Sequence, residues 1–227
     1  MRTLTNGQVA RIFEEAAESY DARSNPYTMR RRADALAARV VGTALEVGGG
    51  TAAVLQAMPD RSRSFHSDIA FPMCRVARSK VHRPSACFDA EQIPLADSSV
   101  DTVVSAEMIY YLRRPQRLVS EAFRILRPGG LLVLSTTNPV MTLLERGRSV
   151  LRKFGFPGMF FDDGSPKFPS LTRLNVLLAD AGFHVESTQG IVSLPFRFCH
   201  LLNCLLERTP LQRFGLFLII AARKPVD

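Results

Sequence analysis

The sequence has 227 residues, enough for one α/β domain with a substantial buried core. Apolar residues make up 46% of it and charged residues 22%, which is typical of a globular protein and excludes a disordered or fibrous chain. Its net charge of +8 comes mainly from arginine, in clusters at 30–32, 113–114 and 146–153. No aromatic side chains alternate with these clusters and no nucleic-acid-binding motif is present, so we do not expect a nucleic-acid partner. A solvated surface and attraction to an anionic membrane both stay open.

Targeting signals and metal-binding patterns are not evident. Residues 1–9 lack the basic start and apolar run of a secretory signal, and the longest apolar run, 216–222, is too short to span a bilayer. No CxxC spacing or paired histidine accompanies the four cysteines, which are Cys74, Cys87, Cys199 and Cys204. We therefore expect buried thiols, no metal, and a cytoplasmic location, with peripheral membrane contact as the alternative.

The first forty residues predict two helices. Apolar residues recur at three- and four-residue steps from Val9 to Tyr20, which is the pattern of an amphipathic helix. Asn25-Pro26 predicts the start of a second helix, because a capping residue is followed by a proline in the first turn. We expect these helices to form an N-terminal cap, residues 1–42.

From residue 43 onward, short strands alternate with helices. The predicted strands are 43–47, 64–68, 86–89, 100–106 and 131–136, and the predicted helices are 51–58, 71–80 and 115–126. The segment Arg127-Pro128-Gly129-Gly130 ends the last helix and turns the chain into the strand that follows. This alternation predicts a parallel sheet covered by helices on both faces.

The C-terminal part departs from the alternation. Ser170 is predicted to cap a helix that ends at Gly182, and two strands, 183–192 and 213–223, follow it. Two consecutive strands indicate an antiparallel edge on an otherwise parallel sheet. Because no linker divides the chain, we predict a single domain, with segments 1–42 (cap), 43–137 (cofactor core), 138–170 (lid) and 171–227 (last helix and strands).

A glycine turn follows the first strand of the core. Gly48-Gly49-Gly50 come directly after Glu46-Val47, and such a turn lets the backbone approach a ligand closely. Taken alone, the turn fits any nucleotide-type cofactor. No Lys-Ser or Lys-Thr pair follows, which excludes a phosphate-binding P-loop.

Motifs further along narrow the choice. Asp68 ends the second strand, where a carboxylate can accept hydrogen bonds from ribose hydroxyls. Phe88-Asp89-Ala90 and then Val100-Asp101-Thr102 come next, before the Arg-Pro-Gly-Gly segment. In this order and spacing, residues 20–137 resemble the class I S-adenosylmethionine-dependent methyltransferases, in particular the branch that includes quinone C-methyltransferases.

The resemblance implies a Rossmann-like fold with a seven-stranded, mostly parallel sheet, an antiparallel C-terminal edge strand, and S-adenosylmethionine as cofactor. The cofactor-binding residues that it implies are Tyr20, Glu46, Gly48, Gly50, Asp68, Ile69, Asp89, Ala90 and Ser105. Within this set, the family pattern gives Glu46 the ordering of the glycine turn or contact with the methionine ammonium group. It gives Asp68 the ribose hydroxyls and Asp89 the adenine amine.

Two positions differ from the family pattern. Ala52 stands where a third glycine is common, which is harmless unless the backbone there is left-handed. The segment 109–112 replaces a histidine that often precedes a leucine, so no catalytic base is carried over. The residues that could serve as a base are Glu107, Tyr110, Tyr111, His66, His184 and His200, and the sequence does not choose among them.

The acceptor is expected to bind where the chain departs from the core pattern. Residues 139–161 combine an apolar helical face with four phenylalanines, and 194–206 form a second apolar stretch. Both favour a small lipophilic or aromatic acceptor, with O-methylation ahead of C- and N-methylation. The alternatives are a membrane quinone or lipid precursor as acceptor, a non-catalytic S-adenosylmethionine-binding protein, and, less favoured, a nicotinamide dehydrogenase.

Overall fold

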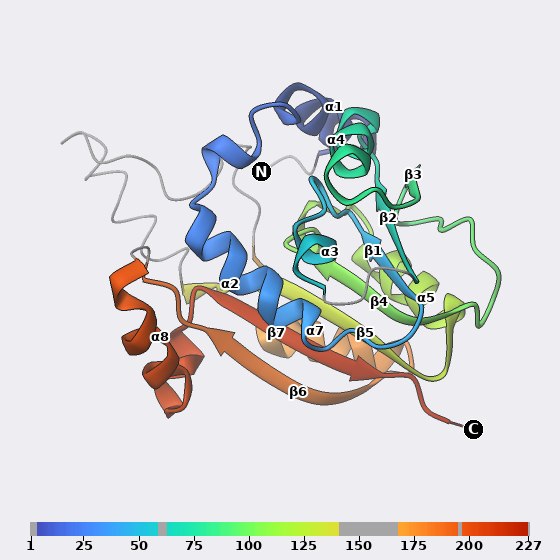
Figure 1. Ribbon diagram of the computed structural model, residues 1–227. Coiled ribbons are helices and arrows are strands. Elements are labelled where there is room, and N and C mark those ends of the chain that lie inside the picture. The colour runs from blue at the N-terminus through green and yellow to red at the C-terminus, as the bar shows by residue number, and fades with distance from the viewer. Residues whose placement is uncertain (1–3, 59–62, 141–167, 195–196, 227) are drawn as a thin grey trace.

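The computed structural model describes residues 4–58, 63–140, 168–194 and 197–226, which form one seven-stranded sheet flanked by helices (Figure 1). The strands are β1 (Ala44–Val47), β2 (Ser64–Asp68), β3 (Ser85–Cys87), β4 (Val100–Ala106), β5 (Leu126–Thr137), β6 (His184–Ile191) and β7 (Phe217–Arg223). The helices are α1 (Asn6–Ala16), α2 (Pro26–Ala37), α3 (Ala53–Ala57), α4 (Phe71–Val81), α5 (Pro115–Ile125), α7 (Leu171–Asp180) and α8 (His200–Glu207). None of the helices in the described ranges is long and apolar enough to cross a membrane.

The sheet has the strand order β3-β2-β1-β4-β5-β7-β6. Strands β1 to β5 pair in parallel, and β7 runs antiparallel to both of its neighbours, β5 and β6. The predicted Rossmann-like sheet, mostly parallel with an antiparallel strand at its C-terminal edge, is therefore confirmed. Strand β6 is at the edge of the sheet and β7 lies between β6 and β5, so the two C-terminal strands complete the sheet together.

Three element boundaries differ from the predictions by more than two residues. Residues 127–130 do not precede β5 as a separate turn but form a bulge inside it, where Val100 pairs with Leu126 and Thr102 already with Leu131. The last strand begins at Phe217 rather than at residue 213, because Pro210–Phe214 form a short 3₁₀ helix. The first helix ends at Ala16, and Tyr20 lies in the turn after it.

Local sequence explains where two helices begin. The Asn25 side chain accepts a hydrogen bond from the Thr28 amide (3.0 Å), and Pro26 occupies the first turn of α2. The Ser170 hydroxyl accepts one from the Arg173 amide (3.2 Å) at the start of α7. Both caps satisfy amides that a helix end leaves without an intrahelical partner.

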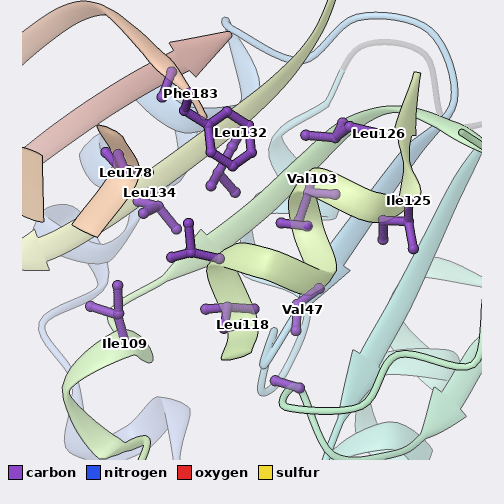
Figure 2. Packing of buried hydrophobic residues seen from close by; sticks show 14 of the residues in the cluster. Val47, Val103, Ile109, Leu118, Ile125, Leu126, Leu132, Leu134, Leu178 and Phe183 are labelled. Atoms are coloured by element: carbon purple, nitrogen blue, oxygen red, sulfur yellow. The ribbon is translucent and has the colours of Figure 1, made fainter. Parts of the chain in front are cut away.

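The hydrophobic core lies on both faces of the sheet. On one face α5 and α7 pack against the strands through side chains such as Leu118, Val103 and Leu178 (Figure 2). On the other face α2, α3 and α4 pack against Val104 and Val133. Because neighbouring residues of a strand point to opposite faces, Val103 and Val104 supply one side chain to each layer.

The apolar stretch after β6 does not cover the sheet as expected. On α8 and just before it, Phe198 is 84% and Leu201 82% exposed, and Leu205 is exposed as well. Of the predicted lid, 138–170, residues 141–167, including Phe160 and Phe161, lie outside the described residues.

Candidate functional site

The site is built at one edge of the sheet. Because β1, β2, β4 and β5 are parallel, their carboxyl ends meet at the same edge, and the segments that follow them lie side by side. A ligand crevice of an open α/β sheet forms at this edge.

The turn after β1 favours glycine, because its backbone is left-handed at two positions and leaves no room for a Cβ atom at one of them. Gly48 and Gly50 have φ values of 62° and 55°, in the left-handed region that favours glycine. A Cβ atom at Gly48 would lie 2.5 Å from Cγ of Met108. Ala52, at φ 63°, is also left-handed, so the departure from the family pattern at this position carries backbone strain.

Glu46 lies beneath this turn. Its side chain is 1% exposed, and Oε1 accepts a long hydrogen bond (3.4 Å) from the Val54 amide at the start of α3. Its other oxygen, Oε2, has no hydrogen-bond partner among the described residues. Burial raises the pKa of Glu46 to about 8, against the opposing effect of the α3 amides. Glu46 is thus placed to order the turn, while its contact with a ligand ammonium group stays a prediction.

Two aspartates follow β2 and β3. Asp68 is 8% exposed, and its carboxylate accepts hydrogen bonds from the amides of Gly50 and Ala70, each at 2.9 Å. Burial raises the pKa of Asp68, and these amide hydrogen bonds oppose the rise. Asp89 accepts the Glu91 amide (2.8 Å) through Oδ1 and the Asn6 side-chain amide (2.6 Å) through Oδ2.

A pocket lies between the turn and the segments after β3 and β4. Its lining comes from Asn6, Val9, Gly48, Ile69, Phe88, Asp89, Ala90, Met108, Tyr111 and Leu112. Four of the nine predicted cofactor residues are in this lining. Of the other five, Tyr20 lies over the turn, 3.8 Å from where a Cβ of Gly50 would be, and Ser105 is buried, with a hydroxyl that has no hydrogen-bond partner in the described part of the chain.

The pocket combines a mostly apolar lining with the carboxylate of Asp89, which accepts an N–H donor from the side-chain amide of Asn6. The amine of a ligand would present the same kind of donor to the same oxygen. No pattern in the sequence indicated that Asn6, on α1, reaches this carboxylate.

Polar groups gather after β4. Glu107 has a φ of 56°, an uncommon conformation for a residue other than glycine. Its carboxylate accepts hydrogen bonds from the hydroxyls of Ser135 (2.8 Å), Thr137 (2.6 Å) and Tyr110 (3.1 Å). Burial, followed by the charge of Glu107, raises the pKa of Tyr110 well above its ordinary value. Tyr110 also packs against Tyr111, with ring centroids 4.8 Å apart.

The six candidate bases lie in different parts of the structure. Glu107, Tyr110 and Tyr111 lie together at the carboxyl edge. His66 is buried beneath the glycine turn, bonds Ser85 (2.8 Å), and has its pKa lowered to about 4 by burial. His184 begins β6, which places it at the opposite edge of the sheet, and His200 begins α8 next to Tyr27.

One arginine of the 30–32 cluster is buried, contrary to the expectation of a solvated basic surface. Arg32 is 7% exposed and packs over the ring of Phe217, 5.0 Å from its centroid. Its position was detectable in the sequence, because Thr28, Arg32 and Leu36 recur at four-residue steps and so share one face of α2.

Comparisons with known proteins agree with this geometry. A family profile described as "Methyltransferase domain" matches residues 45–134. A malonyl-[acyl-carrier protein] O-methyltransferase of Marinomonas sp. (strain MWYL1) is 31% identical over 138 residues, covering 57% of this chain and 51% of that protein. Another, of Xylella fastidiosa (strain M23), is 31% identical over 187 residues, covering 77% of this chain and 61% of that protein.

The chain therefore spans between about half and three fifths of these two relatives, at 51% and 61% of their length. Among solved structures, a SAM-dependent methyltransferase of Thermotoga maritima superimposes with a TM-score of 0.71. That match has 19% sequence identity and covers 95% of this chain and 99% of the other, so it concerns the fold.

Proposed function

We propose that the chain is a class I S-adenosylmethionine-dependent methyltransferase that transfers a methyl group from S-adenosylmethionine to an oxygen of a small lipophilic or aromatic acceptor. The profile match over residues 45–134 and the curated relatives support this proposal, and the fold is compatible with it. One observation carries the proposal: a glycine turn, a buried aspartate at the end of β2 and a second aspartate after β3 lie at the carboxyl edge of the sheet, where the turn and the second aspartate line an apolar pocket.

The described residues fit this cofactor. Ile69 and Ala90 would supply apolar contacts for the adenine ring, and the Asp89 carboxylate would accept its amine in place of the Asn6 amide. Asp68 would accept the ribose hydroxyls, and Tyr20, which lies over Gly50, would cover the bound cofactor. The unpartnered Oε2 of Glu46 gives a buried acceptor in the same turn.

When bound, S-adenosylmethionine supplies an electrophilic methyl group on a positively charged sulfur. The chain's own contribution is to orient the acceptor and exclude water, because alignment of two bound reactants removes much of the barrier. Tyr110, Tyr111 and Met108 form a largely apolar wall after β4 that serves both purposes. The names of the two curated relatives, both O-methyltransferases, support oxygen as the accepting atom.

Calorimetry with the full chain tests the proposal. We expect binding of S-adenosylmethionine and S-adenosylhomocysteine but not of NAD. Asp68→Asn should weaken the binding of both at least ~10-fold, because a charge-assisted hydrogen bond contributes about 1.5–3 kcal/mol.

Asp97→Asn is the matched control, since Asp97 is exposed and pairs with Arg124 away from the pocket. Affinity for the methyl donor should not change in this variant, and thermal unfolding checks that both variants fold. Absence of S-adenosylmethionine binding at millimolar concentration, or an affinity that Asp68→Asn leaves intact, would contradict the proposal.

A further inference from the structure

Helix α8 buries polar side chains and exposes apolar ones, which is the reverse of an ordinary surface helix. On its inner side, Asn203 is fully buried, accepts a hydrogen bond from the Leu194 amide (3.1 Å) and donates one to the Tyr27 hydroxyl (3.0 Å). Glu207, four residues further on, forms an ion pair with Arg31 (2.5 Å). Because residues four apart share one face of a helix, it is the polar face of α8 that is held against α2.

The opposite face of α8 is apolar and exposed. Leu201 and Leu205 are also four residues apart, and they are 82% and 61% exposed. A single exposed leucine is ordinary, whereas a group of large apolar residues on contacting elements marks an interaction surface. What we call the α8 surface consists of these two leucines and of the exposed apolar residues beside them, on α8, just before it and on the adjoining 3₁₀ helix Pro210–Phe214: Phe198, Leu202, Leu211 and Phe214.

The charge around the α8 surface is positive. Arg197, Arg208 and Arg213 are exposed, and within the described ranges none of them forms a salt bridge. Glu207 is the only acid between residues 194 and 215, and it is already paired with Arg31. The α8 surface therefore attracts a negatively charged partner and has no free carboxylate of its own that would repel one.

The form of α8 favours a fluid partner over a rigid one. The helix lies at the outside of the molecule, next to α2 (Figure 1), and its apolar side chains are exposed to solvent. A protein partner would have to supply a groove of matching shape, whereas lipid acyl chains adapt to protruding side chains. Exposed leucine and phenylalanine flanked by arginine are also the composition of helices that lie in the plane of a membrane surface.

We propose that the α8 surface binds the anionic face of a lipid bilayer, with Leu201 and Leu205 between the acyl chains and the three arginines among the headgroup phosphates. The contact is peripheral, because the eight residues of α8 are too few to cross the hydrocarbon layer. Binding of this kind combines the burial of apolar area with the attraction of each arginine to anionic lipids. This inference goes beyond the proposed function and does not depend on it.

The α8 surface is near the edge of the sheet where the candidate site lies. Ile191, the last residue of β6, pairs with Phe217, which in turn pairs with Thr137 at the carboxyl end of β5. The amide of Val192, directly after β6, donates a hydrogen bond to Glu207 of α8 (2.8 Å). A bilayer against α8 would therefore lie close to the carboxyl edge of the sheet, where a lipophilic acceptor of the proposed function would have a short path from the membrane.

Cosedimentation of the full chain with lipid vesicles, in the absence of S-adenosylmethionine, tests the proposal. Two compositions are compared, phosphatidylcholine alone and phosphatidylcholine with about 30% phosphatidylglycerol, each at ~0.05 M and ~0.5 M salt. We expect at least ~10-fold tighter binding to the anionic vesicles at low salt. Most of this preference should disappear at high salt, because salt screens the attraction.

Two variants separate the apolar contribution from the charged one. Leu201→Ser combined with Leu205→Ser should weaken binding to anionic vesicles at least ~10-fold, because two apolar side chains no longer enter the bilayer. Arg208→Gln should weaken it about 5-fold. Val176→Ser on α7 and Arg78→Gln on α4, matched changes at exposed positions, are the controls and should stay within about 2-fold of the wild type.

Equal binding to neutral and anionic vesicles, or binding that the double serine variant retains, would overturn the proposal. So would absence of binding at low salt, which is the result expected if residues 141–167 or a second copy of the chain covers α8. Light scattering tells these two apart, because only a second copy gives a dimer that the double serine variant loses. Thermal unfolding checks that the variants fold, and the comparison of the two vesicle types with the wild-type chain needs no variant.

Discussion

At the scale of single residues, two of the four described non-glycine residues with positive φ differ in their surroundings. His82 (φ 51°) ends α4 and is exposed, whereas Ala52 (φ 63°) precedes α3 and is fully buried. The left-handed conformation costs a residue with a Cβ about 1–2 kcal/mol. The effect of a glycine substitution on stability at each position therefore depends on how much the native side chain contributes to stability.

His82→Gly is expected to raise the free energy of unfolding by about 0.5–1 kcal/mol, because relief of strain exceeds the added entropy of the unfolded chain. At Ala52 the same change also removes a buried methyl group worth about 0.8 kcal/mol, so Ala52→Gly should be near neutral. Urea unfolding of both variants measures the difference. A larger gain at Ala52 than at His82 would show that strain in the turn exceeds the packing of its methyl.

The buried Glu46 makes stability depend on pH. Its folded pKa of about 8 lies above the ordinary 4.5, so the folded state retains a proton that the unfolded state loses, and stability falls as pH rises from about 4.5 to 8. His66, with a folded pKa of about 4, acts in the opposite sense, losing stability as pH falls from about 6.5 to 4.

Between pH 6.5 and 8 most of the His66 effect is already complete, so the change due to Glu46 dominates that of His66 in this window. The wild-type chain without ligand should lose about 2 kcal/mol there, and Glu46→Gln, which cannot ionise, should lose much less. Unfolding curves at pH 6.5, 7.25 and 8 provide the comparison. Parallel losses in both chains would mean that Glu46 is already ionised at neutral pH.

At the scale of elements, most of the fold was predictable from the sequence, because the local patterns of strands, helices and caps agreed with the tertiary structure. Strands 64–68 and 100–106, and the cap at Asn25-Pro26, have the predicted bounds. The bulge at 127–130 was not predictable from Pro-Gly-Gly chemistry, since it depends on pairing with β4 and with residues 224–225. Likewise, the contact of Arg32 with the ring of Phe217 depends on how α2 meets β7, which no local pattern encodes.

The residues of the candidate site also divide into those that the sequence predicts and those that only the folded structure reveals. Gly48, Ile69, Asp89 and Ala90 line one pocket, as a strand-end rule anticipates. Asn6 and Glu107 acquire their partners from segments 83 and 28–30 residues away, so their roles arise only when the chain is folded.

The junction between β6 and the 3₁₀ helix at 210–214 leaves no room for a side chain at Gly190. A Cβ there would collide with the carbonyl oxygen of Gln212. Gly190→Ala should therefore lower the free energy of unfolding by about 2–3 kcal/mol. Gly7→Ala is the control: nothing lies near its Cβ position in α1, so alanine should stabilise by about 0.5–1 kcal/mol. Similar effects in the two variants would contradict this steric account.

At the scale of the whole molecule, Glu207 joins distant parts of the chain. Its Oε1 accepts hydrogen bonds from Arg31 on α2 (2.5 Å) and from the amide of Val192 after β6 (2.8 Å). The side chains of the pair are only 10% and 14% exposed, so solvent screens them weakly.

Glu207→Gln should lower the free energy of unfolding by about 1–3 kcal/mol, because it leaves the Arg31 cation poorly compensated. Asp34→Asn removes the partner of the exposed Arg30 and should change stability by less than about 0.5 kcal/mol. Denaturant unfolding of both variants, repeated in high salt, distinguishes them. An equal effect of the two substitutions would place the Arg31 pair among ordinary surface pairs.

The place of β7 between β5 and β6 has a consequence for the ribosome-bound chain. Strands β5 and β6 are synthesised before β7. Within the described sheet, β6 pairs only with β7, and one side of β5 also pairs with β7. While residues 138–216 emerge, one side of β5 is an open strand edge, and once residues 184–191 have emerged β6 is unpaired as well; open edges are the feature by which incomplete sheets aggregate. Translation speed through this interval should therefore govern the yield of soluble protein more than speed over residues 44–106.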